Sequence, residues 1–242
     1  MVINMLTLYE YYRITEALDF NPDKILGILT GSILFVLTFI ISAFDKPIKL
    51  LALLIPLMVL IFIIELYRKK PNPLVNISIT FLGIFYITVP VSLFNYFGFY
   101  NSGQYDYHII LGFFILLWTN DTAAYLSGLL LGRHRLFERI SPKKSWEGFI
   151  GGTLITLIIA FFLHLFLSDL ARIDWIIIGI IISIAGVYGD LVESMFKRSA
   201  DIKDSGAILP GHGGMLDRFD SVFLSSGLVF LYLLIIKSII VL

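Results

Sequence analysis

Long apolar runs alternate with short polar segments along the 242-residue chain. The runs are about 20 residues long, the length that a helix needs to cross a hydrocarbon core of about 30 Å. The pattern predicts an all-α fold, a polytopic integral membrane protein with about seven transmembrane helices. We expect these helices at residues 25–44, 48–66, 75–96, 108–132, 149–168, 174–193 and 222–242.

Residues 1–23 have a different pattern, in which apolar, aromatic and acidic positions are mixed. Two interpretations stay open for this segment: an interfacial helix or a weak extra span. The segment lacks a basic start followed by an apolar core and a small-residue cleavage site, so we do not interpret it as a signal peptide.

Basic residues are distributed unequally between the predicted loops. Arg68–Lys70, Arg133–Lys144 and Lys197–Arg218 follow the second, fourth and sixth runs, which places them on one side of the membrane. Loops rich in Lys and Arg stay in the cytoplasm. The pattern therefore predicts cytoplasmic basic loops and a cytoplasmic N-terminus, most simply in a bacterial inner membrane.

Composition narrows the chemistry further. Charged residues make up 15% of the chain, against roughly 25% in soluble domains. The chain has no cysteine, which excludes disulfides, thiolate metal sites and thiol nucleophiles. Its formal net charge is zero, so charge gives no reason to expect a nucleic-acid partner.

One acidic residue lies inside an apolar run. Asp121 is near the middle of the fourth run, in W-T-N-D-T-A-A-Y-L-S-G. A charge at the centre of a spanning helix costs roughly 2.5–3.5 kcal/mol on insertion scales, so it should face the bundle interior or a wet cavity. Asp121 is either a functional group or a structural carboxyl hydrogen-bonded to neighbouring helices. Gly128 and Gly132 form a G-x-x-x-G pair on the same face, which favours close helix packing.

The densest polar segment follows the sixth run: S-M-F-K-R-S-A-D-I-K-D-S-G-A-I-L-P-G-H-G-G-M-L-D-R-F-D. Its Lys197, Arg198 and Lys203 are cationic donors suited to phosphate oxygens. If the preceding helix continues, Asp190 and Ser194 lie on one face with Lys197.

Two further carboxylates end this segment. Asp217 and Asp220 can share one face if their segment is helical, and with Asp190 they would form a set of three. Such an oxygen-rich set suits Mg²⁺ rather than zinc. A divalent ion bridging phosphates is the recurring solution for phosphoryl and nucleotidyl transfer. The residues alone thus predict a membrane enzyme acting on a phosphorylated or nucleotide substrate.

Two loops complete the predicted polar face. The turn P-G-H-G-G has backbone N–H groups at Gly213 and Gly214 that could approach an anion closely, and its His212 could donate to a phosphate or shape the loop. The loop at 133–148 contains S-P-K-K-S-W-E-G. That loop either contacts substrate phosphates or attracts anionic lipids.

The segment Ser194–Asp220 resembles the signature of phosphatidate cytidylyltransferases (CDP-diacylglycerol synthases), S-x-F-K-R-x4-K-D-x-G-x2-L-P-x-H-G-G-M-x-D-R-F-D. The pieces D-T-A-A-Y-L-S-G at 121–128 and S-P-K-K-S-W-E-G-F-I-G-G at 141–152 resemble the same family in type and order. The resemblance covers about residues 118–221. It suggests an N-terminal membrane region at 1–107, with the interfacial segment and about three spans, and a catalytic membrane domain at 108–242.

The resemblance implies that CTP and phosphatidic acid react to give CDP-diacylglycerol and pyrophosphate at the cytoplasmic surface of the bilayer. It implies Mg²⁺ on Asp190, Asp217 and Asp220, and it leaves room for a second cation such as K⁺ and for a homodimer. The expected catalytic residues are Asp190, Lys197, Arg198, Lys203, Asp217, Arg218 and Asp220. The expected substrate-binding residues are Asp121, Ser141, Lys143, Lys144, Glu147, Ser194, His212, Gly213 and Gly214.

Two other functions remain as alternatives. One is a cytidylyltransferase or kinase that acts on another lipid phosphate or on a polyprenol, which a comparison of acceptors would separate. The other is a transporter or channel, because a seven-helix bundle with a buried aspartate is also expected there. Transporters tend to place their sites near the midplane and to contain repeats, whereas here the polar groups gather at one surface.

Overall fold

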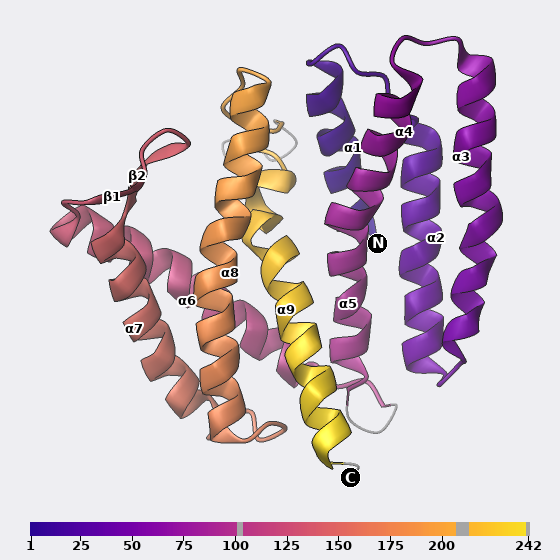
Figure 1. Cartoon of the computed structure of the whole chain (residues 1–242). Helices are drawn as coiled ribbons and strands as arrows, with labels where there is room; N and C mark the ends of the chain where they lie inside the picture. Colours follow the sequence, from indigo (N-terminus) through magenta and orange to yellow (C-terminus); the bar gives the residue numbers. More distant parts are fainter. Residues whose placement is uncertain (101–103, 207–212, 241–242) are drawn as a thin grey trace. The chain divides into compact units, whose positions relative to one another are not determined.

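The computed structural model describes residues 1–100, 104–206 and 213–240, and for residues 237–240 it describes the backbone only. The described chain is almost entirely helical (Figure 1). It divides into two compact units. Unit 1 comprises Met1–Gln104 and Phe196–Phe219, and unit 2 comprises Tyr105–Met195 and Asp220–Leu242.

Unit 1 contains the N-terminal helices. They are α1 (Val2–Glu16), α2 (Lys24–Ala43), the 3-10 helix η1 (Ile48–Leu54), α3 (Ile55–Arg68), α4 (Pro73–Gly83), the π-helical turn η2 (Ile84–Thr88) and α5 (Val89–Gly98). Pro90 lies at the start of α5 and has no backbone N–H to donate, which fits an interruption of the α-helical ladder at η2.

Tyr12 packs α1 against two neighbouring helices. Its side chain is fully buried, and its hydroxyl donates to the carbonyl oxygen of Thr80 at 2.8 Å. A Cβ atom at Gly27 or Gly83 would lie 2.2 or 2.8 Å from the Tyr12 side chain. Glycines on α2 and α4 thus make room for the ring, which fixes α1 in unit 1.

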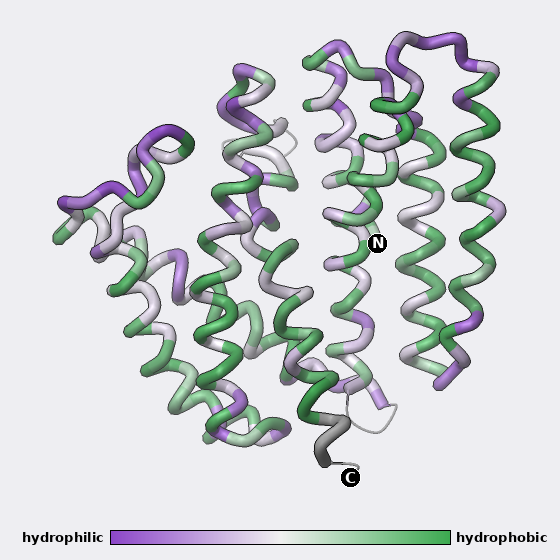
Figure 2. The backbone as a smooth tube through the Cα atoms, viewed as in Figure 1, coloured by the Kyte–Doolittle hydropathy of each residue, from purple (hydrophilic) through white to green (hydrophobic). Residues whose placement is uncertain are grey.

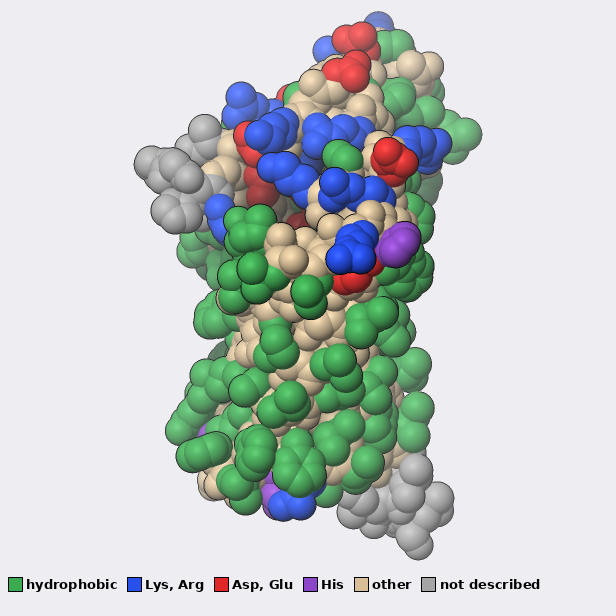
Figure 3. Space-filling model, turned by 90° about the vertical axis from the view of Figure 1, so that its left-hand side faces the viewer, with side chains coloured by type: hydrophobic (Ala, Val, Ile, Leu, Met, Phe, Trp, Pro, Cys, Tyr) green, Lys and Arg blue, Asp and Glu red, His purple; other side chains and the backbone are tan. Residues whose placement is uncertain are grey.

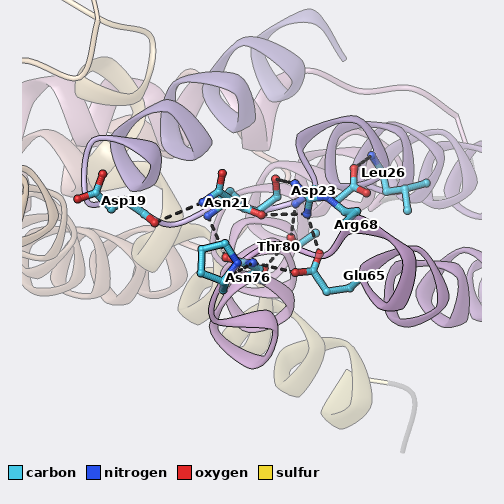
Figure 4. A network of polar contacts seen from close by, with 10 residues as sticks. Asp19, Asn21, Asp23, Leu26, Glu65, Arg68, Asn76 and Thr80 are labelled. Atoms are coloured by element: carbon cyan, nitrogen blue, oxygen red, sulfur yellow. Dashed lines mark hydrogen bonds and ion pairs between the residues drawn. The ribbon is translucent and has the colours of Figure 1, made fainter.

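A polar network holds the connection between α1 and α2 (Figure 4). The buried Glu65 pairs with Arg68 at 2.7 Å and accepts from Nδ2 of Asn76 at 2.7 Å. Asn76 and Arg68 in turn bind the backbone N–H and C=O of Asn21, both at 2.9 Å. The side chain of Asp23 then caps α2 by accepting from the amide of Leu26. The charged groups of this loop are therefore satisfied within unit 1.

Unit 2 is built from the remaining helices and one small hairpin. Its elements are α6 (His108–Leu131), the antiparallel strands β1 (Arg135–Phe137) and β2 (Ser141–Ser145), α7 (Trp146–Leu163), α8 (Arg172–Ser199) and α9 (Leu216–Ile240). The last residues of α8 and the first of α9 belong to unit 1.

Small residues bring α6 and α7 close together. A Cβ atom at Gly148 would lie 2.8 Å from the carbonyl oxygen of Ala124 and 3.1 Å from Cα of Gly128. A Cβ atom at Gly152 would meet that of Ala124 at 2.8 Å. Gly128 thus serves helix packing, as the G-x-x-x-G spacing predicts.

The predicted spans are confirmed. Among the described residues, seven helices are long and apolar enough to cross a membrane: 24–43, 48–68, 73–98, 108–131, 146–163, 172–199 and 216–236. Their middles are mostly hydrophobic, with a hydrophilic stretch inside α6, and most hydrophilic residues gather toward the helix ends (Figure 2). The fold is that of an all-α polytopic membrane protein.

Two segments have structures that the sequence pattern did not specify. Residues 1–23 contain the 15-residue helix α1, which is not among those seven spans. The loop at 133–148 contains the hairpin β1–β2, which the sequence pattern did not predict. The division into a membrane region at 1–107 and a catalytic domain at 108–242 stays a prediction.

Candidate functional site

Three carboxylates and one lysine gather in unit 2, and we call Asp121, Lys144, Asp190 and Asp220 the carboxylate–lysine cluster. The Nζ atom of Lys144, on β2, lies 2.5 Å from Oδ2 of Asp190, on α8. It also donates to the carbonyl oxygen of Val187 at 3.3 Å. Asp121 on α6 and Asp220 on α9 both interact electrostatically with Asp190 and with Lys144. Lys144 therefore contacts Asp190 and lies within electrostatic range of acidic groups from two further helices.

Close packing of α8 and α9 explains part of this cluster. A Cβ atom at Gly189 would lie 2.6 Å from the carbonyl oxygen of Asp220, so glycine is needed there. Because α8 continues to Ser199, Ser194 lies one turn beyond Asp190 and donates to its Oδ1 at 3.1 Å. This confirms that the sixth spanning helix extends past Asp190.

The hairpin lies between the end of α6 and the start of α7 and carries the expected substrate-binding residues Ser141, Lys143 and Lys144. Ser145 caps α7 by accepting from the amide of Gly148 at 3.2 Å. Glu147 accepts from the amide of Arg133 at 3.0 Å, and it lies 2.6 Å from Nδ1 of His134. Glu147 thus closes the base of the hairpin.

The outer residues of the hairpin are open to solvent or lipid. Lys143 is exposed and Ser141 is half-buried. Lys and Arg side chains gather at one end of the face seen in Figure 3, above a broad hydrophobic band. The basic residues of the hairpin segment are Arg133, Arg135, Arg139, Lys143 and Lys144.

In unit 1, Asp217 organises the signature segment. Its Oδ1 atom accepts from Nζ of Lys197 at 2.7 Å, and both side chains are largely buried. Its Oδ2 atom accepts from the amide and the hydroxyl of Ser205, each at 3.0 Å, and from the amide of Gly214 at 2.8 Å. As the sequence suggested, Asp217 and Asp220 both lie in a helix, α9.

Two glycines of this segment have a steric role. Gly213 has a φ of 79°, and a Cβ atom there would lie 3.0 Å from Oδ2 of Asp217. A Cβ atom at Gly214 would lie 2.0 Å from Oγ of Ser205. Side chains would therefore break the contacts around Asp217.

The remaining predicted residues differ in exposure. Arg198, Lys203 and Arg218 are exposed, and Arg198 donates to the carbonyl oxygen of Ile202 at 3.2 Å. His212 lies outside the described residues. The roles expected for these residues stay predictions.

The residues of the carboxylate–lysine cluster fit Mg²⁺. They offer oxygen donors, and the predicted ligands Asp190 and Asp220 are both in this cluster, whereas Asp217 belongs to unit 1. Mg²⁺ is usually held by one or two carboxylates together with water and substrate phosphates, so Asp190 and Asp220 could hold it without a third carboxylate.

A second group of potential ligand atoms lies at the start of α6. Within the described part of the chain, Asp106, His108 and Asp169 form the group of three whose potential ligand atoms lie within 4.8 Å of one another. Nδ1 of His108 lies 2.5 Å from Asp169 and 3.1 Å from Asp106, so contacts of the histidine with both carboxylates account for the closeness of the group. The backbone N–H of His108, which donates to Asp106, lowers the pKa of Asp106.

Glu10 and Ser205 of unit 1 were not identified from the sequence. Glu10 of α1 is buried, and its Oε2 atom accepts from the amide of Leu216 at 2.7 Å and from the hydroxyl of Ser205 at 3.2 Å. The available signal was an acidic residue in the aromatic stretch Y-E-Y-Y.

The fold and these charged groups define a polytopic membrane protein with a cluster of three acidic residues and one lysine between its helices. The chain belongs to the cytidylyltransferase family, whose family model matches residues 1–236. Among curated relatives it is similar to the phosphatidate cytidylyltransferase of Staphylococcus aureus strain COL, with 50% identity over 125 residues. That match covers 51% of this chain and 48% of the relative.

Two other staphylococcal phosphatidate cytidylyltransferases are similar to the chain. The Staphylococcus saprophyticus protein is 49% identical over 123 residues, covering 50% of this chain and 47% of the relative. The Staphylococcus epidermidis protein is 46% identical over 125 residues, covering 51% and 48%. The chain thus spans about half the length of the curated relatives it matches.

Proposed function

We propose that the protein transfers a cytidylyl group from CTP to phosphatidic acid, giving CDP-diacylglycerol and pyrophosphate, a step of phospholipid biosynthesis. The observation that carries the proposal is Lys144 among Asp121, Asp190 and Asp220 in a member of the cytidylyltransferase family. The names of the similar staphylococcal proteins support the choice of phosphatidic acid as the acceptor.

The reaction needs no nucleophile from the protein. A phosphate oxygen of phosphatidic acid attacks the α-phosphorus of CTP and forms the new P–O bond. The bond from the α-phosphorus to the oxygen that bridges to the β-phosphorus breaks, and pyrophosphate leaves with that electron pair. The obstacle is the approach of two polyanions, so electrostatic stabilisation should supply most of the catalysis.

Cationic side chains would reduce this repulsion. The residues proposed to bind the phosphates of CTP and of the lipid are Lys143, Lys144, Lys197, Arg198, Lys203 and Arg218. The Lys ammonium binds a phosphate oxygen as a compact positive charge, and the planar Arg guanidinium can donate two parallel hydrogen bonds to a phosphate. Lys144 contributes a positive charge that is already held in place by Asp190.

Mg²⁺ would be held by Asp190 and Asp220, with Asp217 as a further predicted ligand. When bound, the ion would neutralise phosphate charge and orient the reacting groups. Lys144 lies against Asp190 and balances part of its negative charge. A second cation such as K⁺ and a homodimer stay predictions.

The proposed location follows from the loops. The hairpin and the signature segment would lie on the cytoplasmic side of a bacterial inner membrane, because their Lys and Arg residues favour that side. CTP would arrive from the cytosol, while the acyl chains of the lipid stay in the bilayer.

An acceptor comparison tests the proposal. Purified protein in detergent receives CTP labelled at the α-phosphate, Mg²⁺, and either phosphatidic acid or a polyprenyl phosphate. We expect labelled CDP-diacylglycerol with phosphatidic acid and little label with the polyprenyl phosphate. Label transferred only to the polyprenyl phosphate would show that the acceptor is wrong.

A further inference from the structure

Glu10 is a buried acid at the end of a chain of contacts in unit 1. It lies on α1, 1% exposed, in the segment that the sequence left as an interfacial helix or a weak span. Burying a carboxylate is costly unless hydrogen bonds or opposite charge stabilise it. Glu10 should therefore have partners that stabilise its carboxylate.

The contacts join α1 to the signature segment. The Oε2 atom of Glu10 accepts from the amide of Leu216, the first residue of α9, at 2.7 Å. The first amides of a helix have no partner within the helix, and its N-terminus carries partial positive charge. The Glu10 carboxylate supplies both the acceptor and the negative charge.

The same oxygen connects Glu10 to Asp217. The hydroxyl of Ser205 lies 3.2 Å from Oε2 of Glu10 and 3.0 Å from Oδ2 of Asp217. Asp217 in turn holds Lys197. A residue near the start of the chain thus reaches two predicted active-site residues through one serine.

The backbone packs closely around Glu10. A Cβ atom at Gly206 would lie 2.6 Å from its Oε1 atom, and one at Gly214 would lie 2.6 Å from its Oε2 atom. Next to Glu10, the ring of Tyr11 packs on that of Phe196, with centroids 6.3 Å apart. Phe196 precedes Lys197, so α1 contacts both ends of the signature segment.

We propose that Glu10 is a positioning residue of the active site: it holds the start of α9 and Ser205 so that Asp217 faces Lys197. This inference rests on the proposed function. Glu10 contacts no reacting group in this account. Small displacements of groups that bind substrate can cost about 100-fold in rate, which is why a remote acid can matter.

The test compares three variants. Glu10→Ala removes Oε2, the oxygen that accepts from both Ser205 and Leu216, and Glu10→Gln keeps a side-chain oxygen of the same reach. Glu16→Ala is the matched control, because Glu16 lies on the same helix, is exposed, and pairs with Lys24 instead. Each protein is first checked by gel filtration and thermal unfolding. If the alanine variant does not fold, the glutamine variant carries the test.

Two readouts are then measured. Residue-resolved amide hydrogen exchange at Leu216 and Gly214 reports the contact without requiring turnover, and steady-state kinetics report kcat and KM. We expect exchange at Leu216 to rise at least about tenfold in Glu10→Ala and less in Glu10→Gln, because a lost acceptor frees the amide. We expect kcat to fall about 10- to 100-fold, with a smaller change in KM. Glu16→Ala should match the wild type.

The results separate the two claims. Unchanged exchange at Leu216, or unchanged kcat in a variant whose exchange rises, would overturn the role of Glu10. Equal losses in Glu16→Ala would also overturn it. A wild-type protein without turnover would overturn the proposed function instead, and the exchange data would still decide whether Glu10 holds α9.

Discussion

Replacing Lys144 by methionine should strengthen Mg²⁺ binding in the absence of nucleotide. Methionine keeps most of the length of the side chain and removes its charge, so Asp190 loses the cation 2.5 Å from its Oδ2 atom. Coulomb's law in bulk water gives about 1.7 kcal/mol for unit charges at this distance. Exposed ion pairs measured by double-mutant cycles contribute up to about 1 kcal/mol.

The expected gain in Mg²⁺ binding free energy lies between these two values. The side chains of Lys144 and Asp190 are 23% and 35% exposed, so the pair is neither fully solvated nor buried. A difference of about 1–1.5 kcal/mol corresponds to about 5- to 13-fold tighter Mg²⁺ binding. Turnover should nevertheless fall by about 100-fold, because a positive charge facing the substrate phosphates is lost.

Isothermal titration calorimetry of Mg²⁺ into the detergent-solubilised protein measures this effect. Lys143→Met is the matched control, since Lys143 is the exposed neighbour on the same strand. The control should bind Mg²⁺ as the wild type does. Equal or weaker binding by Lys144→Met, or an equal gain in both variants, would refute the competition between lysine and metal for Asp190.

Other expectations concern single side chains. Asp217→Asn should reduce turnover below about a tenth of the wild-type value while the protein still inserts, because breaking a buried ion pair is costly. Asp201→Asn is the control, because Asp201 is exposed, and it should keep wild-type turnover. Turnover assays and gel filtration measure both variants. Gly213→Ala should lower the free energy of unfolding by about 1–2 kcal/mol, because Gly213 has a positive φ. Gly227→Ala is the control and should lower it less, because a Cβ atom there meets open space. Thermal unfolding measures both variants. The hydrogen bond from the first amide of α6 lowers the pKa of Asp106 in the folded protein. Ionised Asp106 therefore stabilises the fold above its unfolded pKa of about 3.9, and this contribution is lost as the pH falls through the lower folded pKa. Asp106→Asn should therefore lower the melting temperature at pH 7, and the difference should shrink on acidification below about pH 4.

The spanning helices could be predicted because about 20 consecutive apolar residues are a strong signal. The hairpin β1–β2 could not, because S-P-K-K-S has few residues of high strand propensity. Its closure depends on Glu147, which lies on the following helix and binds back to Arg133 and His134. A contact between elements is not visible in the local pattern.

In the candidate site too, the sequence indicates single residues but not the contacts between them. Asp121, Asp190, Asp220 and Lys144 were identified because charges beside or inside apolar runs stand out. That Lys144 pairs with Asp190 required the structure, since 46 positions separate them in the sequence. Glu10 lies about 200 positions before its partners Ser205 and Leu216, and nothing in the local sequence indicates them.

The central claim is transfer of the cytidylyl group, and the fate of two labels tests it directly. The wild-type protein in detergent receives phosphatidic acid, Mg²⁺ and CTP labelled at either the α- or the γ-phosphate. The account predicts that the α label enters the lipid fraction and that the γ label leaves as water-soluble pyrophosphate, both only when Mg²⁺ is present. Entry of the γ label into the lipid would identify a kinase, and no label in lipid from well-folded protein would contradict the proposed reaction.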